Sequence, residues 1–253
     1  SKDPGDFTTV QNMEPFIKDA WVRFTENGHK FTLGLSATPG TGTNEDVLGY
    51  RAVEKTALDL YRMTSTRDKG ISVAGPLDSK GQASYMVMIG DASGTRSSQG
   101  NTRAYYGRLT FKPDESVVLD LYADSWKRPS GVRWVTVKGE AFYTVPKGKL
   151  GFTYATQHRS MSGGPNMDIR VWSAYGQVEA TPKVRPFVRY DWLSDALPDA
   201  DKIEFLKLSK DGAPSMLLAG VKIKVHEQAE IVPNVAIVDY RRGAGGIKPG
   251  GDT

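Results

Sequence analysis

The stretch Lys30–Ser36 reads KFTLGLS and alternates between apolar and polar or small residues. In an extended chain, Phe31, Leu33 and Leu35 fall on one face, because successive side chains of a β-strand point to opposite faces. The spacing therefore predicts a strand with one apolar and one polar face.

The same alternation recurs along the chain. It is clear in Tyr105–Lys112 (YYGRLTFK), Val117–Asp124 (VVLDLYAD) and Leu217–Val225 (LLAGVKIKV). About twelve such segments are present, most of roughly 8–12 residues, which is close to the length that a tilted strand needs to cross a bilayer. The expected spans are 16–25, 29–37, 69–77, 82–90, 103–112, 116–125, 132–144, 149–157, 168–181, 184–193, 214–226 and 229–241.

The connections between these segments alternate in length. Short turns fall at 26–28, 113–115, 146–148, 182–183 and 227–228, and longer polar loops at 91–102, 125–131, 158–167 and 194–213. Short turns at one rim and long loops at the other are typical of outer-membrane barrels. We predict an all-β fold, a transmembrane antiparallel β-barrel, with residues 1–253 forming one domain. Period-two alternation would also fit a soluble β-sandwich, in which the apolar faces would form a core.

Aromatic residues lie near many of the strand ends. Such rings favour the headgroup level of a membrane, which predicts interfacial girdles; alternatively, strands simply favour aromatic residues. The residues are Phe16, Trp21, Phe24, Tyr106, Phe111, Trp126, Trp134, Tyr143, Trp172, Tyr190, Trp192 and Tyr240.

Several classes of protein are disfavoured by composition. No apolar run reaches the roughly 18 residues expected of a membrane-spanning helix. Cysteine is absent, which removes disulfide frameworks and thiolate sites. The net charge of +4 is not concentrated in a basic tract, so we expect no nucleic-acid partner. The first residues are polar, so we expect a signal peptide to have been removed or to lie outside this sequence.

One segment, Asn44–Met63 (NEDVLGYRAVEKTALDLYRM), departs from the alternation and predicts a helix. Asn44 is a plausible N-cap, Glu45 and Asp46 follow in the first turn, and Arg62 lies near the end, which suits the helix dipole. On such a helix Arg51 and Lys55 would share one face.

Six short motifs, in this order, resemble bacterial outer-membrane porins, and most closely the group related to phosphate-selective (anion) porins. They are GYRAVEK at 49–55, LDL at 58–60, TRDKG at 66–70, GDASG at 90–94, VRYD at 188–191 and IVPN at 231–234. The resemblance implies a passive channel, sixteen strands in the complete protein and a trimer.

This sequence departs from the family by lacking strands before Phe16 and a closing C-terminal strand. Either the sequence is incomplete or neighbouring chains supply those strands. The Gly-rich residues 243–253 are expected to be flexible.

The resemblance also implies a loop folded into the lumen, which we place at 38–66. A helix that caps the barrel outside, or docks on a neighbouring subunit, is the alternative. The expected constriction residues are Arg51, Glu54, Lys55, Asp59, Arg62, Arg67 and Asp68. Their charges would create a transverse field, or would form ion pairs that anchor the loop.

The polar faces of the strands are expected to line a water-filled lumen. The expected pore-lining residues are Arg23, Lys30, Arg108, Lys112, Lys138, Arg185, Arg189, Asp191, Lys222 and Lys224. Basic groups exceed acidic ones modestly, which predicts a weak anion preference. Alternatively, these residues form cross-strand ion pairs with little net effect.

Catalysis has little support in the sequence. His29, His158 and His226 form no metal-binding motif, and no nucleophile elbow or phosphate-binding loop is present. We therefore expect no enzyme activity, no cofactor and no metal. A porin that passes small anionic or neutral solutes is favoured over a plugged barrel with a structural or surface-assembly role, and over a soluble carbohydrate-binding protein. Expected partners are outer-membrane lipid, lipopolysaccharide, two further copies in a homotrimer, and surface proteins.

Overall fold

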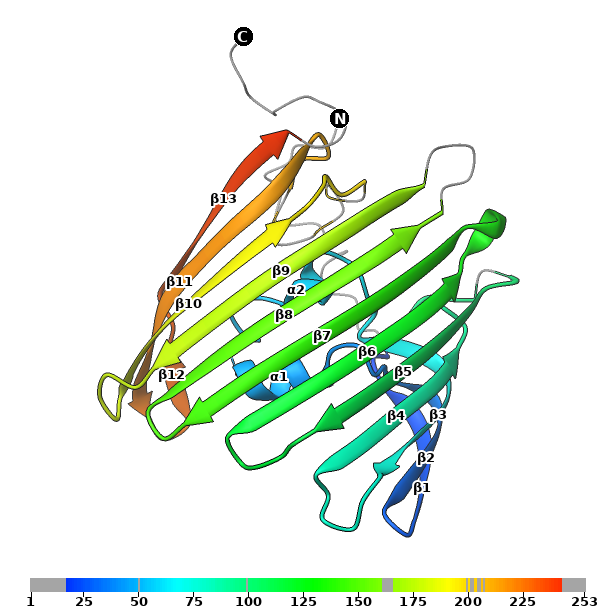
Figure 1. Ribbon diagram of the computed structural model, residues 1–253, viewed down its shortest axis with the longest axis horizontal. Coiled ribbons are helices and arrows are strands. Elements are labelled where there is room, and N and C mark those ends of the chain that lie inside the picture. The colour runs from blue at the N-terminus through cyan, green and yellow to red at the C-terminus, as the bar shows by residue number, and fades with distance from the viewer. Residues whose placement is uncertain are drawn as a thin grey trace.

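Thirteen antiparallel strands form one sheet in a computed structural model of the chain (Figure 1). The structure describes residues 17–242 except 50, 99, 161–165, 199, 201, 202, 204, 205 and 207. The segment 243–253, expected to be flexible, therefore lies outside the described residues. The strands are β1 (Ala20–Glu26), β2 (His29–Ala37), β3 (Arg67–Pro76), β4 (Ala83–Gly90), β5 (Arg103–Phe111), β6 (Val117–Lys127), β7 (Arg133–Val145), β8 (Gly148–Arg159), β9 (Met167–Val178), β10 (Val184–Leu193), β11 (Gly212–His226), β12 (Ala229–Ile231) and β13 (Asn234–Arg242).

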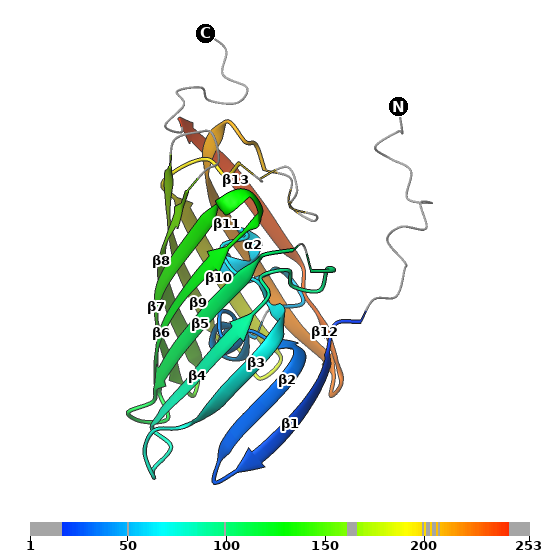
Figure 2. The same cartoon turned by 90° about the vertical axis from the view of Figure 1, so that its right-hand side faces the viewer.

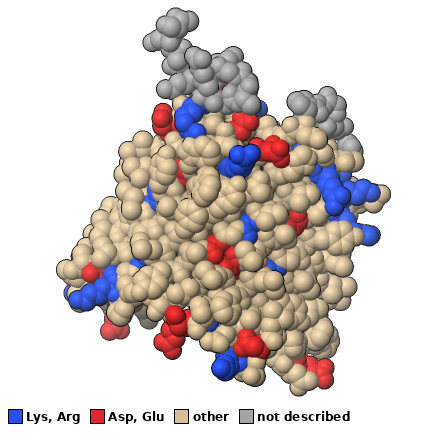
Figure 3. All heavy atoms as spheres, in the orientation of Figure 1, with Lys and Arg blue, Asp and Glu red and all other residues tan. Residues whose placement is uncertain are grey.

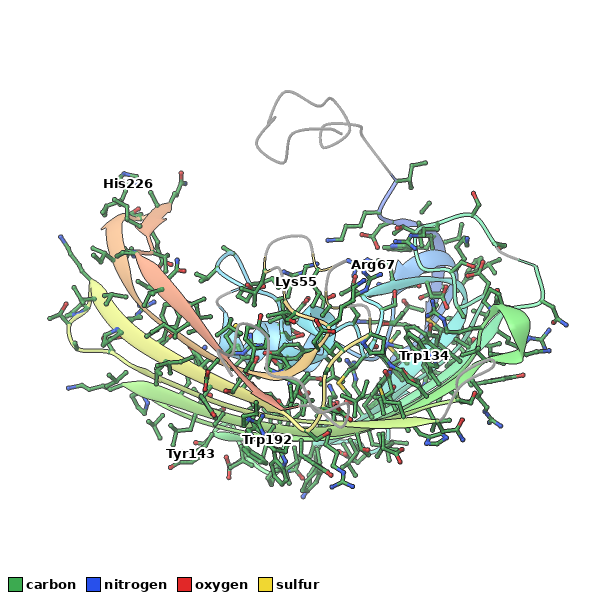
Figure 4. The ribbon with its side chains drawn as sticks, turned by 90° about the horizontal axis from the view of Figure 1, so that it is seen from above. Lys55, Arg67, Trp134, Tyr143, Trp192 and His226 are labelled. Carbon is green, nitrogen blue, oxygen red and sulfur yellow. The ribbon has the colours of Figure 1, made fainter. Side chains whose placement is uncertain are left out.

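Each strand from β1 to β11 pairs with the next, so the chain runs up and down across the sheet. The twelfth expected segment is two strands, because Val232 and Pro233 interrupt it. The 15-residue strand β11 pairs with β12 near its end and with β13 along its first part. Figures 2 and 4 show the sheet curved into an open trough, with β1 and β13 at its two edges. Among the described strands, these two edges do not pair with each other.

The convex face of the sheet is apolar and exposed. Leu33, Leu121 and Leu150 are 60%, 62% and 61% exposed, although large aliphatic side chains are normally buried in a soluble domain. Figure 3 shows this face, on which charged side chains are most abundant along the two rims. The all-β antiparallel prediction is confirmed. The soluble β-sandwich hypothesis is wrong, because the alternating apolar residues face outward instead of forming a core.

The concave face has a core of its own. The segment 38–66 lies within the trough, and its Leu58, Leu60 and Met63 pack against buried residues of the wall such as Ile169 and Val171. Residues from the connection between β10 and β11, including Leu197 and Ile203, join the same cluster. Two parts of the chain therefore fill the trough from its long-loop side.

The expected single helix over Asn44–Met63 is wrong. The structure has two short helices, α1 (Gly42–Leu48) and α2 (Ala57–Leu60), and a further 3-10 turn, η2, at Pro129–Gly131. Gly49 ends α1 with a left-handed φ of 67°, a conformation that glycine adopts at little cost. The N-cap of α1 is Thr41, not Asn44. Arg51 and Lys55 are not helical, so they do not share a helical face. Among the described residues, no helix is both long and apolar enough to cross a bilayer.

Candidate functional site: the concave face and its inward segment

The segment 38–66, called the inward segment below, leaves the sheet after β2 and returns to it at β3. Its two ends meet, because the Thr38 N–H donates to the Thr66 carbonyl at 3.2 Å. The Thr38 hydroxyl also donates to the Ser65 carbonyl. Figure 4 places Lys55 inside the trough and Tyr143 on the opposite, convex side. The segment is thus a closed loop that projects into the concave space from the long-loop rim.

A buried network on β6 to β8 holds the first part of the inward segment. The Lys138 ammonium donates to Glu140 at 2.6 Å and to the Gly40 carbonyl at 3.0 Å. Glu140 also accepts a hydrogen bond from Asn44, at 2.5 Å. Asp120, which is fully buried, accepts from the Thr43 hydroxyl at 2.8 Å. Asn44 therefore binds the wall instead of capping α1.

A second anchor, on β10, holds the later part of the inward segment. Arg189 and Asp191 form a two-point ion pair at 2.8 and 2.5 Å, and both are buried. The Arg189 guanidinium also donates to the Lys55 carbonyl at 2.5 Å. Asp191 accepts from the Tyr61 hydroxyl at 2.9 Å and from Ser173 at 2.6 Å. Burial raises the pKa of the Tyr61 hydroxyl well above its usual value, and the charge of Asp191 raises it further, so this hydroxyl stays a donor.

A third anchor lies at the C-terminal end of α1. Lys149 donates to the Val47 carbonyl at 3.0 Å, Tyr175 to Leu48 at 3.3 Å, and Lys222 to Gly49 at 2.5 Å. Carbonyls at this end of a helix lack intrahelical partners, and the helix dipole favours cations there. Three wall strands therefore satisfy the carbonyls at which α1 ends.

A cavity of about 300 Å³ opens beside this third anchor, at the short-turn end of the trough. Four cationic side chains and two acidic ones line it, so it carries a net positive charge. They are Lys147, Lys149, Arg185, Lys222, Glu179 and Glu230. Arg185 lies 3.5 Å from Glu179 and 3.9 Å from Glu230.

The expected constriction residues do not act as one group. Arg51 pairs with Glu45 at 2.9 Å and with Asp59 at 3.0 Å, so its charge is locally compensated. Burial raises the pKa of Asp59, while the positive charges of Lys55 and Arg51 oppose that shift.

The remaining expected constriction residues have mainly local roles. Glu54 accepts a hydrogen bond from the Lys55 N–H, and Arg62 has a left-handed φ of 55°. Arg67 begins β3 and pairs with Asp19 at 2.8 Å. Asp68 is fully buried and accepts from Tyr106 at 2.7 Å and from the Ala92 N–H at 2.9 Å. It is buried and holds the loop after β4, so its expected place at the pore constriction is corrected.

The expected pore-lining residues divide into buried and accessible groups. Lys138, Arg189 and Asp191 face the trough but are covered by the inward segment, so the expectation that they line open water is corrected. Arg23 donates to Thr32 at 2.9 Å and Arg108 to the Pro39 carbonyl at 3.3 Å. Lys30, Lys112 and Lys224 are exposed toward the short-turn rim, and Arg23 is exposed on the edge strand β1. Arg185 and Lys222 line the cavity.

Sequence reasoning missed several residues of the site. Lys149 begins an expected strand with the same parity as buried Thr153, so the alternation could have assigned it to the concave face. Tyr61 and Asn44 gave no such signal, because their partners are 130 and 96 residues away. Trp126 and Trp134 were expected in an interfacial girdle, but they are buried on the concave side and stack with ring centroids 6.2 Å apart. Among the described residues, no group of three His, Asp or Glu side chains could hold a metal ion.

The arrangement is an apolar convex sheet whose polar concave face holds an infolded segment, and the fold is similar to that of several solved structures. The outer-membrane expressed OmpT of Vibrio cholerae superposes with a TM-score of 0.67 at 13% identity, covering 90% of this chain and 72% of that one. The chain has the fold of outer-membrane porins. An anion-selective porin from Comamonas acidovorans matches with a TM-score of 0.65 at 11% identity, over 87% of this chain and 67% of that porin.

A trimer form of in-vitro folded Vibrio cholerae OmpT matches over 90% of this chain with a TM-score of 0.63, at 13% identity and covering 71% of that chain. No family model and no curated protein sequence matches this chain. At identities this low, the likeness establishes the fold, and the function has to be argued from the site.

Proposed function

We propose that the chain is the wall and infolded segment of an outer-membrane porin, a channel for passive diffusion of small hydrophilic solutes. The observation that carries this proposal is the division between the two faces of the sheet. The convex face exposes large apolar side chains, which suits lipid, and the concave face carries charged and polar side chains, which suits water. In this proposal the inward segment narrows the lumen, with Lys55 among the residues at the constriction.

We further propose a weak anion preference. The cavity at the short-turn end has four cationic and two acidic side chains, and a cation-rich mouth raises the local concentration of anions. A homotrimer is part of the same proposal, supported by the trimeric form of one similar structure.

A plugged barrel with a structural or assembly role is the second candidate. It is favoured by the apolar core in which Leu58, Leu60 and Met63 pack with residues of the connection between β10 and β11. Such a core occupies space that an open channel would leave to water.

Ion conductance across a planar lipid bilayer separates the two candidates. An open porin gives stepwise current increases, and a salt gradient gives a reversal potential of the sign expected for anions. Lys147→Glu places a negative charge at the cavity, where Lys147 is exposed in a turn, and should lower the anion-to-cation permeability ratio roughly twofold. The matched variant Lys80→Glu lies in the exposed turn between β3 and β4, outside the cavity, and should leave the ratio nearly unchanged. Absence of current steps from folded protein would favour the plugged barrel, and equal effects of the two variants would contradict the assignment of selectivity to the cavity.

A further inference from the structure

Three exposed cationic side chains stand side by side on the convex face, at the long-loop rim. Arg103 begins β5, Lys127 ends β6 and Arg133 begins β7. In the sheet register, Arg103 is directly opposite Lys127, and Lys127 is directly opposite Arg133. We call these three residues the basic triad.

The triad lacks a counter-charge of its own. Like charges directly opposite each other destabilise a sheet, because such side chains lie only about 5 Å apart at their Cβ atoms. Among the described residues, no carboxylate lies within ion-pair distance of any of the three. The Arg133 guanidinium donates a hydrogen bond to the neutral Ser125 hydroxyl, at 3.1 Å.

Elsewhere on this face, two basic side chains at the rim have acidic partners. Lys69 lies 3.1 Å from Asp91, and His158 lies 2.7 Å from Asp168. The triad differs from these two sites because it places three cations side by side with no acidic partner, and an external anion would stabilise such a cluster.

An apolar surface lies directly beneath the triad on the same strands. Tyr105 follows Arg103 by two residues, Leu121 precedes Lys127 by six, and Val137 follows Arg133 by four; their exposed fractions are 50%, 62% and 52%. Even spacing puts each of them on the same face as the cation of its own strand. A cationic band above an apolar band matches a molecule with an anionic head and hydrocarbon chains, whereas a free anion would use only the upper band.

We propose that the basic triad is a binding site for the phosphate groups of an anionic membrane lipid, with the acyl chains of that lipid on the apolar surface beneath. Two guanidinium groups suit phosphate, because each can donate two parallel hydrogen bonds to its oxygens. The site faces the leaflet on the long-loop side, which in an outer-membrane barrel is the outer leaflet. The inference requires that the sheet spans a membrane, but not that its lumen conducts.

The test measures lipid binding by the full chain in detergent micelles, using native mass spectrometry. The probe is lipid A, a glycolipid with two phosphates, and the comparison lipid is its dephosphorylated form. We expect lipid A to bind at least about tenfold more tightly than the dephosphorylated lipid, since charge-assisted hydrogen bonds are lost with the phosphates. The triple variant R103Q/K127Q/R133Q should lose that difference. The matched variant K80Q/K112Q/K183Q removes the same charge from exposed positions at the short-turn rim and should retain it.

Heat-modifiable migration on a gel checks that each variant folds, and Arg133→Gln alone replaces the triple variant if the latter does not fold. Inorganic phosphate at the same concentration should compete poorly, because it leaves the apolar surface uncovered. Equal lipid A binding by wild type and the triad variant, or equal loss in the control variant, would overturn the proposal. Full competition by inorganic phosphate would also overturn it, because the site would then bind a free anion and not a lipid. A channel that conducts normally while failing this test would leave the proposed function intact.

Discussion

Asp191→Asn is expected to lower the free energy of unfolding by about 3–5 kcal/mol, the range measured when one partner of a buried ion pair is removed. Arg189 is 1% exposed and Asp191 is fully buried, so the buried guanidinium would keep its charge while losing the Asp191 carboxylate. Tyr61 and Ser173 would also lose a carboxylate acceptor. Because Arg189 holds the Lys55 carbonyl, the inward segment should loosen, and channel current should become noisier.

The measurement is urea unfolding in liposomes, followed by heat-modifiable migration. Glu115→Gln removes a negative charge from an exposed turn and should change stability by less than about 0.5 kcal/mol. The double variant Arg189→Met/Asp191→Leu should recover most of the loss, since replacing both ions with apolar groups leaves no buried charge. Equal stability of Asp191→Asn and wild type would mean that this ion pair is not an anchor.

Gly70→Ala is expected to have the second-largest effect, a loss of about 2–3 kcal/mol typical of overpacking at a site that cannot expand. A Cβ at Gly70 would lie 2.0 Å from the Ile89 carbonyl oxygen and 2.8 Å from the Gly90 Cα, and both are backbone atoms of the paired strand β4. The strands would have to separate where the loop after β4 is held by Asp68.

Gly107→Ala is the matched control, because Gly107 also lies within a strand and a Cβ there would meet nothing within 4 Å. It should leave stability unchanged or raise it slightly, since alanine lowers the entropy of the unfolded chain. The same unfolding assay applies to both variants. If the two alanine variants were equally stable, the close approach of β3 and β4 would be contradicted.

The strands of this protein could be predicted from sequence because period two is a local signal. Where the alternation is regular, the polar residues that share a face with Lys30 or Arg108 identify the concave side of the sheet. The division of the last segment at Pro233 could also have been predicted, because proline has no N–H to donate to a sheet hydrogen bond. The two-helix form of the inward segment was harder to predict, because Lys149, Tyr175 and Lys222 satisfy the carbonyls of residues 47–49 from distant strands.

Burial within the trough could not be predicted from parity alone. Lys138, Arg189 and Lys222 share the polar face, yet the first two are covered by the inward segment and the third borders a cavity. That distinction depends on contacts such as Lys138 to Gly40, which join residues 98 positions apart. Alternation reports which face a side chain points to, but it does not report what covers that face.

The central claim is that the convex face contacts lipid while the concave cavity contacts water, and fluorescence quenching in liposomes tests it most directly. The chain contains no cysteine, so single cysteines can be labelled without background. An environment-sensitive fluorophore at Leu121→Cys or Val137→Cys should be quenched by brominated lipid and not by aqueous iodide. At Gln177→Cys or Arg185→Cys, which line the cavity, iodide should quench and brominated lipid should not. Quenching by iodide at all four positions, in protein that stays monodisperse without detergent, would contradict the membrane-spanning wall and with it the proposed porin.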